Sequence, residues 1–217
     1  MAAMGTRLSD LRLFFGEFRR NFRTTGAILP SGNRLSAALA GRVRQRDDDR
    51  PRRILEVGHG TGAVTRHIVA ALGPNDHLDL VELNPSFVEC LRERFRTDPA
   101  FQPVADRAQV WHSPVEGLPA NATYHVIVSG LPLNNFAVDE VAHILDVLRR
   151  LAEPGGTLSF FEYIGIRRVK ALVTRPAERT RLRGVGQLVD RFLAQYEVRR
   201  DWIWPNVPPA WVHHAQF

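Results

Sequence analysis

A glycine-rich turn limits what this chain can fold into more than any other feature. Alternate positions from 58 to 62 are glycines, between an apolar segment predicted as a strand (53–58) and a segment predicted as a helix (61–72). A dinucleotide fingerprint, G-x-G-x-x-G, would need a further glycine where the chain has Ala63. A tighter turn that begins with an acid, Glu56, instead suits a cationic ligand without a phosphate.

Strand-like and helical segments alternate along the chain. The predicted strands cover 53–58, 78–83, 109–113, 125–129 and 157–163, and the predicted helices cover 33–43, 61–72, 85–95, 138–151 and 187–196. This alternation predicts an α/β fold with an open parallel sheet and helices on both faces. A polar stretch at 44–50 is typical of a linker, so we expect a helical, basic N-terminal extension over 1–50 and one domain over 51–217.

The charge of the chain is distributed unevenly. The net charge of +6 combines +7 over 1–53, −7 over 54–163, +7 over 164–200 and −1 over 201–217. Basic segments attract polyanions, such as nucleic acid or an anionic membrane surface. Two solvated helices would carry the same charge without a partner, and this alternative stays open.

The first basic segment contains a predicted amphipathic helix over 7–23. Its apolar side chains recur at helical spacing, and arginines lie beside the stripe that they form. Such a helix could lie in a membrane interface, or it could pack on the domain. The stripe and its arginines are Leu8, Leu11, Phe15, Phe18 and Phe22, with Arg12, Arg19 and Arg23.

Several classes of protein are excluded or disfavoured. No apolar run approaches the roughly 18 residues that a membrane-spanning helix needs. The N-terminus lacks a compact apolar region followed by a cleavage site, and a single cysteine, Cys90, rules out an internal disulfide. We therefore expect a cytoplasmic protein. We expect no metal site, since the adjacent His213 and His214 would point to opposite faces of a strand.

The turn, its flanking strand and helix, and an acid at the end of the next strand resemble the class I S-adenosylmethionine-dependent methyltransferases. Glu82 lies 20 residues after the last glycine of the turn, where an acid can accept hydrogen bonds from both ribose hydroxyls of an adenosine. The resemblance implies a Rossmann-like fold with a seven-stranded, mostly parallel sheet, whose last two strands would fall in 195–204 and 210–217. It also implies S-adenosylmethionine as cofactor and S-adenosylhomocysteine as its product.

The same resemblance implies which residues hold the cofactor. The glycine turn approaches its methionine part, the acid after the second strand binds its ribose, and the backbone after the third strand contacts its adenine. Carried onto this chain, the residues are Glu56, Gly58, His59, Gly60, Thr61, Gly62, Glu82, Leu83, Asn84, Ser113, Pro114, Val115, Ser129, Gly130 and Leu131.

Two of these positions depart from the family pattern. An acid or small polar residue often holds the adenine amine, and here Ser113 or the nearby Glu116 would have to do so. His59 is unusual inside the turn. We expect it to face solvent, and a substrate contact is the alternative.

A second resemblance covers most of the chain. The segments GAILPSGNRLSAAL, VELN, SGLPLNNF and WPNVPPAWVHHAQF are similar to bacterial phospholipid N-methyltransferases. Those enzymes methylate the amine of phosphatidylethanolamine towards phosphatidylcholine, and related ones methylate ornithine lipids. The resemblance implies a peripheral enzyme on the inner face of the cytoplasmic membrane, with an anionic membrane surface and an aminophospholipid as partners. Pro30 and Ser31 resemble a family segment that closes over the cofactor, although Ser31 could equally cap a helix.

Amine methylation needs few protein groups, because the sulfonium of the cofactor is already activated. The amine has to lose a proton and line up with the methyl group, and an alkyl ammonium has a pKa of about 10.4 by analogy with lysine. Backbone carbonyls at Ser129 to Leu131 could hold the amine, and Tyr163 could position it by a cation–π contact. Glu162 is a further candidate proton acceptor, and Tyr163 could also simply end its strand.

The same fold also occurs in proteins with functions other than lipid methylation. An adenine N6 methyltransferase would need an amide and an aromatic ring where this chain has Gly130 and Leu133, which disfavours a base substrate and a nucleic-acid partner. An RNA or small-molecule methyltransferase remains the alternative, and a cofactor-binding module without catalysis is the third hypothesis. We expect a monomer.

Three tryptophans, Trp202, Trp204 and Trp211, cluster near the end of the chain. Their amphipathic rings favour membrane interfaces. Because they fall on the last two predicted strands, we expect them to pack in the core.

Overall fold

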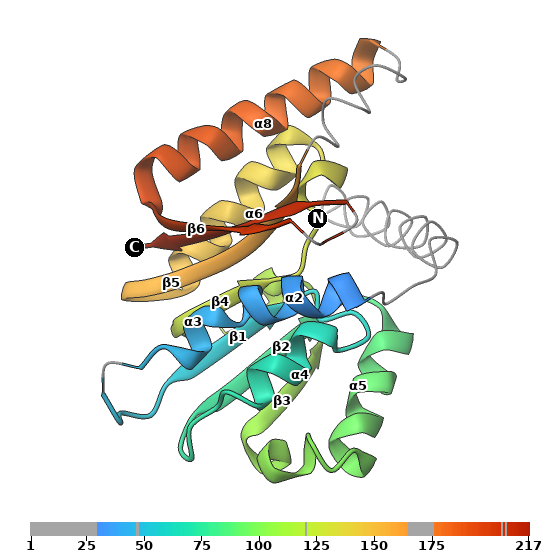
Figure 1. Ribbon diagram of the computed structural model, residues 1–217, viewed down its shortest axis with the longest axis vertical. Helices are drawn as coiled ribbons and strands as arrows, with labels where there is room; N and C mark the ends of the chain where they lie inside the picture. Colours follow the sequence, from blue (N-terminus) through green and yellow to red (C-terminus); the bar gives the residue numbers. More distant parts are fainter. Residues whose placement is uncertain (1–29, 47, 120, 165–175, 205, 207) are drawn as a thin grey trace.

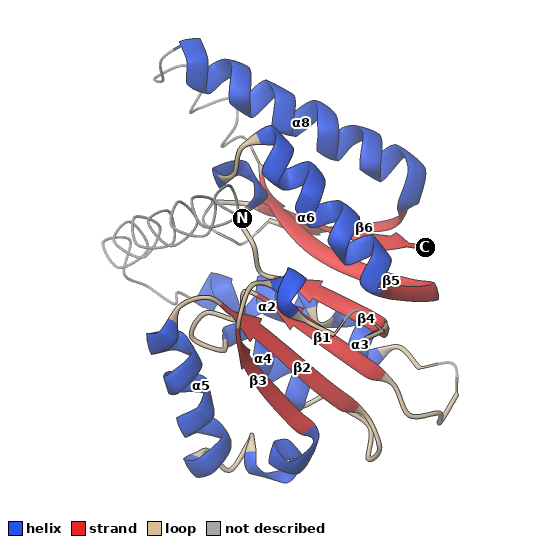
Figure 2. Ribbon diagram, turned by 180° about the vertical axis from the view of Figure 1, so that it is seen from behind, coloured by secondary structure: helices blue, strands red, loops and turns tan. Residues whose placement is uncertain are grey.

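A seven-stranded sheet dominates the part of the chain that the structure, a computed structural model, describes: residues 30–46, 48–119, 121–164, 176–204, 206 and 208–217. The strand order is β3-β2-β1-β4-β5-β7-β6, and only β7 runs antiparallel to its neighbours (Figures 1 and 2). The strands are β1 (Arg53–Val57), β2 (His77–Glu82), β3 (Ala108–His112), β4 (Tyr124–Ser129), β5 (Ala152–Tyr163), β6 (Glu197–Ile203) and β7 (Ala210–Gln216). The predicted seven-stranded, mostly parallel sheet is confirmed.

Helices cover both faces of this sheet (Figure 2). One face carries α2 (Pro30–Leu39), α3 (Gly41–Arg44), α4 (Ala63–Val69) and α5 (Pro85–Thr97), and the other carries α6 (Val138–Leu151) and α8 (Pro176–Tyr196). The short helices η1 (Gln102–Arg107), η2 (Val115–Gly117) and η3 (Leu133–Asn135) lie in the connections.

Two apolar clusters, one on each face, form the core. Neighbouring residues of β1 divide between them: Leu55 packs in the cluster with α6 and α8, and Ile54 in the cluster with α2, α4 and α5. This division follows from the alternation of side chains along a strand. The central strands are buried on both faces, which explains why they read as continuous apolar runs in the sequence.

Two elements are longer than the sequence predicts. α8 begins at Pro176 rather than at residue 187, so the basic residues of 176–183 belong to its first turns. β5 begins at Ala152, so the Pro-Gly-Gly sequence of 154–156 is an irregularity within the strand rather than a turn before it. Gly155 has a φ of 81°, which a glycine adopts without strain.

α2 and α3 fall in the predicted N-terminal extension, yet both pack on the sheet. Leu39 and Val43 are fully buried in the same cluster as Ile54 and Ile68. The structure therefore builds the domain core from residues on both sides of the predicted boundary at residue 50.

Several predictions concern parts of the chain outside the described residues. The predicted amphipathic helix over 7–23 is one of them, with all of its proposed membrane-binding residues. The side chains of Pro30 and Ser31 are not described either, although α2 begins at Pro30. Among the described helices, none is long and apolar enough to cross a membrane.

The prediction that the tryptophans pack in the core is wrong for two of the three. Trp202 is 65% exposed and Trp204 is 67% exposed, whereas Trp211 is partly buried. The physical reason is position: β6 is the edge strand and its side chains are poorly covered along its whole length, unlike those of β7, while Trp204 lies beyond the last residue of β6.

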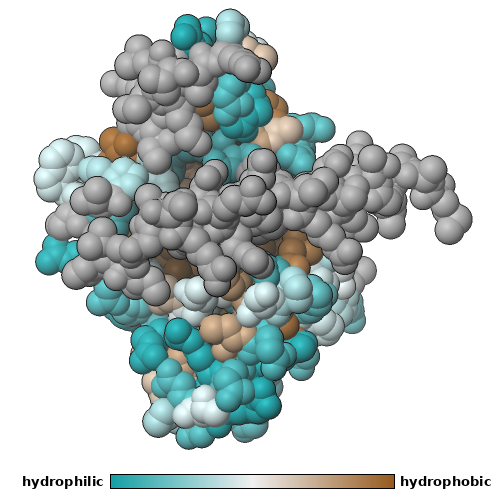
Figure 3. Space-filling view, turned by 90° about the vertical axis from the view of Figure 1, so that its right-hand side faces the viewer, coloured by the Kyte–Doolittle hydropathy of each residue, from teal (hydrophilic) through white to brown (hydrophobic). Residues whose placement is uncertain are grey.

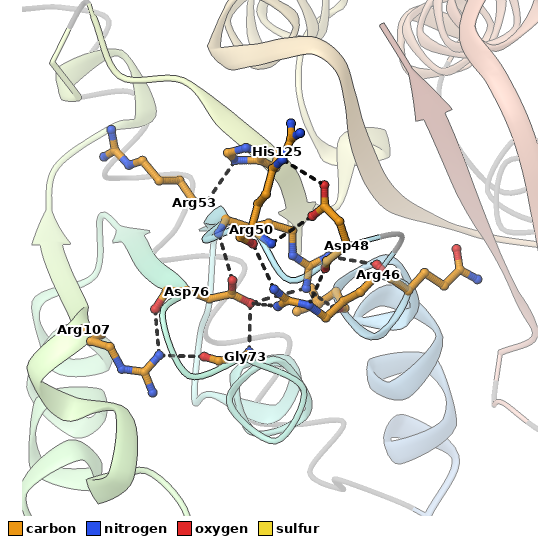
Figure 4. A network of polar contacts seen from close by, with 11 residues as sticks. Arg46, Asp48, Arg50, Arg53, Gly73, Asp76, Arg107 and His125 are labelled. Atoms are coloured by element: carbon orange, nitrogen blue, oxygen red, sulfur yellow. Dashed lines mark hydrogen bonds and ion pairs between the residues drawn. The ribbon is translucent and has the colours of Figure 1, made fainter.

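A polar network ties together the edge of the sheet at which β1 and β2 begin (Figure 4). Asp76 is fully buried and accepts hydrogen bonds from Arg46 Nη1 at 2.7 Å, from Gly73 N at 2.9 Å and from Arg52 N at 2.9 Å. Burial alone would raise the pKa of Asp76, but these backbone donors and the charges of Arg52 and Arg46 hold it below its ordinary value.

We expect Asp76→Asn to lower the free energy of unfolding at neutral pH by about 3 kcal/mol, because it leaves buried guanidinium charge without its partner. A carboxylate whose pKa is lowered by folding stabilises the folded state fully at pH values above the ordinary pKa of an aspartate. This stabilisation is lost as the pH falls through the pKa of the folded state. Urea unfolding across pH should therefore show the gap to wild type closing below about pH 4.

Asp106→Asn is the matched control, since that carboxylate is 80% exposed and pairs only loosely, at 3.8 Å, with Arg107. It should change stability little. A gap for Asp76→Asn that stays constant in acid would contradict the assignment.

Candidate active site

The strands β1 to β5 end at one edge of the sheet, here called the carboxyl edge, and a cleft opens there. Ligands of open α/β sheets bind at this edge. The cleft walls contain seven of the predicted cofactor residues, Gly58, Glu82, Leu83, Ser113, Pro114, Val115 and Leu131, together with Val57, Val81, Glu116, Phe136 and Ile144. Four separate strand ends therefore supply one cleft.

The glycine turn needs its glycines for conformation and for space. Gly58, Gly60 and Gly62 have φ values of 74°, 52° and 82°, in the left-handed region that favours glycine. A Cβ at Gly58 would lie 2.7 Å from Leu131 Cδ2. Gly62 N donates to His59 O at 2.9 Å and closes the turn before α4.

The ends of β1 and β4 touch through backbone atoms. Gly130 N donates to Val57 O at 2.8 Å, and a Cβ at Gly130 would lie 2.6 Å from Gly58 O. The Ser129 hydroxyl beneath this contact is buried and accepts a hydrogen bond from Leu131 N at 3.3 Å. Leu131 lines the cleft, whereas the Ser129 side chain holds the loop.

Glu82 joins the second strand to the glycine turn. Its Oε2 accepts from Gly60 N at 3.1 Å, and its Oε1 accepts from Leu83 N at 2.8 Å and Asn84 N at 2.9 Å. Burial raises the pKa of this carboxyl despite these donors. Asn84 caps α5, since its side chain accepts from Ser86 N at 3.0 Å, and it does not line the cleft.

Glu56 lies on the central strand before the glycine turn and is 1% exposed. Its Oε2 is buried without a hydrogen-bond partner among the described residues. Burial raises the pKa of Glu56 to about 8. A largely protonated acid thus lies behind the turn at neutral pH.

The expectation that His59 faces solvent is wrong. Its side chain is buried, with Nδ1 3.0 Å from Gly60 O, and its Nε2 has no hydrogen-bond partner in the described part of the chain. Burial lowers the pKa of His59 to about 4, so the imidazole is neutral at pH 7. Sequence reasoning missed this burial because a turn residue is exposed by default.

Tyr163 ends β5, as predicted, but it does not line the cleft. It packs edge to face against Phe161, with ring centroids 5.0 Å apart, and burial raises the pKa of its hydroxyl. Glu162 lies opposite Trp211 in the register of β5 and β7 and does not line the cleft either.

Arg181 is a residue of the site region that the sequence did not reveal. From α8 it donates to Asn134 O at 2.9 Å and also to Phe136 O, while Glu178 accepts from it at 2.6 Å. These bonds hold the loop that carries Phe136 into the cleft wall. Nothing in the sequence around Arg181 marks it, because its partners lie 45 and 47 residues away.

Comparisons with known proteins identify the kind of domain. Residues 54–156 match the family model described as a methyltransferase domain. An ornithine lipid N-methyltransferase of Singulisphaera acidiphila is 28% identical over 156 residues, which cover 70% of this chain and 77% of that protein. A compactin diketide synthase of Penicillium citrinum is 35% identical over 115 residues, or 51% of this chain but only 4% of the synthase.

The fold has solved counterparts. The O-methyltransferase TomG of Streptomyces achromogenes, solved in complex with SAM (S-adenosylmethionine), is 17% identical, with a TM-score of 0.62 over 96% of this chain and 88% of that one. The chain therefore has the class I methyltransferase fold, and its cofactor is S-adenosylmethionine.

The cleft fits this cofactor. In the glycine turn, Gly60 has no atom within 4 Å of the place that a Cβ would occupy, so a ligand can approach its backbone. Glu82 offers carboxylate oxygens in the cleft wall, and Ser113 Oγ is buried there without a partner among the described residues.

We expect the pH dependence of stability to report Glu56. Its pKa is raised to about 8 in the folded protein. The contribution of this group to the free energy of unfolding is therefore present in full below the ordinary pKa of a glutamate, and it is lost as the pH rises through the pKa of the folded state. Glu56→Gln, a neutral isostere, should therefore gain stability over wild type between pH 5 and pH 8, by more than about 1 kcal/mol. Urea unfolding of the cofactor-free protein measures this.

Glu89→Gln serves as control, because that side chain on α5 is 67% exposed. Its stability should follow wild type across the same range. If the gap for Glu56→Gln fails to widen with pH, the buried acid is not protonated in the folded protein.

Proposed function

We propose that this S-adenosylmethionine-dependent methyltransferase methylates the amine of a membrane aminolipid, of the phosphatidylethanolamine or ornithine lipid type. The observation that carries the proposal is the similarity to an ornithine lipid N-methyltransferase, which extends over 70% of this chain and 77% of that protein. The two substrates share a primary amine on a lipid head group at a bilayer surface. Their shared chemistry defines the proposed substrate class.

In this proposal the cleft residues bind and orient the cofactor, which supplies a methyl group on a sulfonium. Glu82 accepts hydrogen bonds from the ribose, and Ser113 with the backbone of Pro114 and Val115 meets the adenine. The glycine turn receives the methionine part. Glu56, whose pKa is raised to about 8 in the cofactor-free protein, lies behind the turn, and the positive charge of a bound sulfonium would favour its ionised form.

The amine would reach the methyl group beside Gly130 and Leu131, where the β4 loop borders the cleft. The backbone carbonyls from Ser129 to Leu131 hold it in line, and alignment alone contributes much of the rate. A cleft with mostly apolar walls disfavours the ammonium form, so the amine releases its proton to solvent water more readily on entering the cleft than it does in bulk water. Tyr163 lies outside the cleft walls and packs against Phe161, so the proposal assigns the positioning of the amine to the backbone carbonyls.

The proposed location follows from the substrate. The amine of such a lipid lies at a bilayer surface, so an enzyme that methylates it has to bind there, and we propose the inner face of the cytoplasmic membrane. The predicted helix over 7–23, with its phenylalanines and arginines, is the proposed attachment element.

Methyl transfer from radiolabelled S-adenosylmethionine tests the substrate class. Anionic vesicles would contain phosphatidylethanolamine in one arm and ornithine lipid in another, with phosphatidylcholine vesicles as blank and an unmodified RNA transcript as a further arm. We expect label in one of the two aminolipids and none in the blank. Label in RNA alone, or in no lipid despite measured cofactor binding, would contradict the proposal.

We expect Glu82→Ala to weaken cofactor binding at least about tenfold, because hydrogen bonds to a charged acceptor contribute roughly 1.5–3 kcal/mol each. Isothermal titration calorimetry with S-adenosylhomocysteine measures the dissociation constant. Glu89→Ala on the exposed face of α5 is the control and should bind like wild type. Normal affinity of Glu82→Ala would refute the ribose assignment.

A further inference from the structure

Two neighbouring tryptophans are exposed beside the carboxyl edge. In the part of the chain that the structure describes, the exposed large apolar side chains are Val198, Trp202 and Trp204, at 53%, 65% and 67%. The two indole rings form a pair, with centroids 6.1 Å apart. Burying such rings is strongly favourable, so a pair left in water indicates a surface that meets a partner.

The topology places this pair on the same edge as the cleft. β6 is antiparallel to β7, and β7 is antiparallel to β5, so β6 ends where β5 ends. Trp202 lies near the end of β6 and Trp204 directly follows it. In Figure 1 the connection from β6 to β7 is on the right-hand side, where the parallel strands also end.

α8 brings positive charge to the same edge. It ends at Tyr196, immediately before β6 begins, so it runs opposite to β6 and its first turns lie at the carboxyl edge. Arg179 and Arg183 in these turns are exposed, and the described residues offer neither of them an ion pair. Figure 3 looks onto this edge and shows apolar residues at the surface beside the grey atoms.

We propose that Trp202 and Trp204 insert into the interfacial layer of an anionic lipid bilayer, and that Arg179 and Arg183 bind its head groups. Indole rings prefer the head-group region, and arginines are attracted to an anionic leaflet. The proposal rests on the proposed function, and it adds the surface that turns the cleft towards the membrane. It assigns docking to described residues, independently of the helix predicted over 7–23.

The experiment uses the full chain and vesicles of phosphatidylglycerol and phosphatidylcholine with brominated acyl chains, which quench tryptophans that enter the bilayer. The difference between wild type and Trp202→Phe/Trp204→Tyr would isolate the pair from Trp111 and Trp211. We expect wild-type emission to shift to the blue and to be quenched at least twofold more than that of the variant. High salt should weaken the binding.

A second pair of variants tests affinity by vesicle sedimentation. Trp202→Ala/Trp204→Ala should weaken binding at least tenfold without changing the thermal unfolding midpoint, because both side chains are exposed. Val198→Ala is the matched control: it lies on the same strand and is also exposed, but it lies near the opposite edge of the sheet. It should bind like wild type.

The outcomes separate the docking surface from the proposed function, since quenching and sedimentation require no methyl transfer. Quenching without any labelled lipid would support the surface and refute the aminolipid substrate. Equal vesicle affinity and equal quenching in wild type and variant would overturn the docking proposal, whatever the substrate. A dimer of wild type in analytical ultracentrifugation that the double alanine variant loses would also overturn it, because the surface would then belong to a second copy.

Discussion

One buried carboxylate holds the functional edge of this protein together. Glu82 ends β2, yet it accepts backbone hydrogen bonds from the glycine turn after β1 and from its own following residues. The same side chain lines the cleft. A single group therefore sets both the geometry of the turn and the position of the carboxyl proposed to bind the ribose, and neither can shift without the other.

A second constraint is the close approach of β1 and β4. Gly58 and Gly130 leave no room for a side chain between their backbones, so the loop after β4 lies directly against the glycine turn. Arg181 fixes the far part of this loop from α8. The cleft is thus bounded by rigid strand ends on one side and by an anchored loop on the other, as positioning two reactants requires.

The two halves of the sheet have different tasks in the proposed enzyme. The parallel half, β3-β2-β1-β4, supplies the cofactor cleft, and the half formed by β5, β7 and β6 supplies the exposed edge with Trp202 and Trp204. Because β6 is parallel to β5, both tasks fall on one edge of the molecule. A lipid amine presented at a membrane would meet the cleft and the docking surface on the same side.

The sequence by itself determined the alternation of strands and helices and seven of the residues that line the cleft. Apolar runs, the glycine turn and Glu82 are local signals, and α6 occupies the predicted range, Val138–Leu151. Only the tertiary structure decided the burial of His59, the exposure of Trp202 and Trp204, and the contact of Arg181 with the loop after β4. Each of these depends on which distant segments become neighbours. Periodicity reports how a residue relates to its own helix or strand, whereas burial depends on what packs against it.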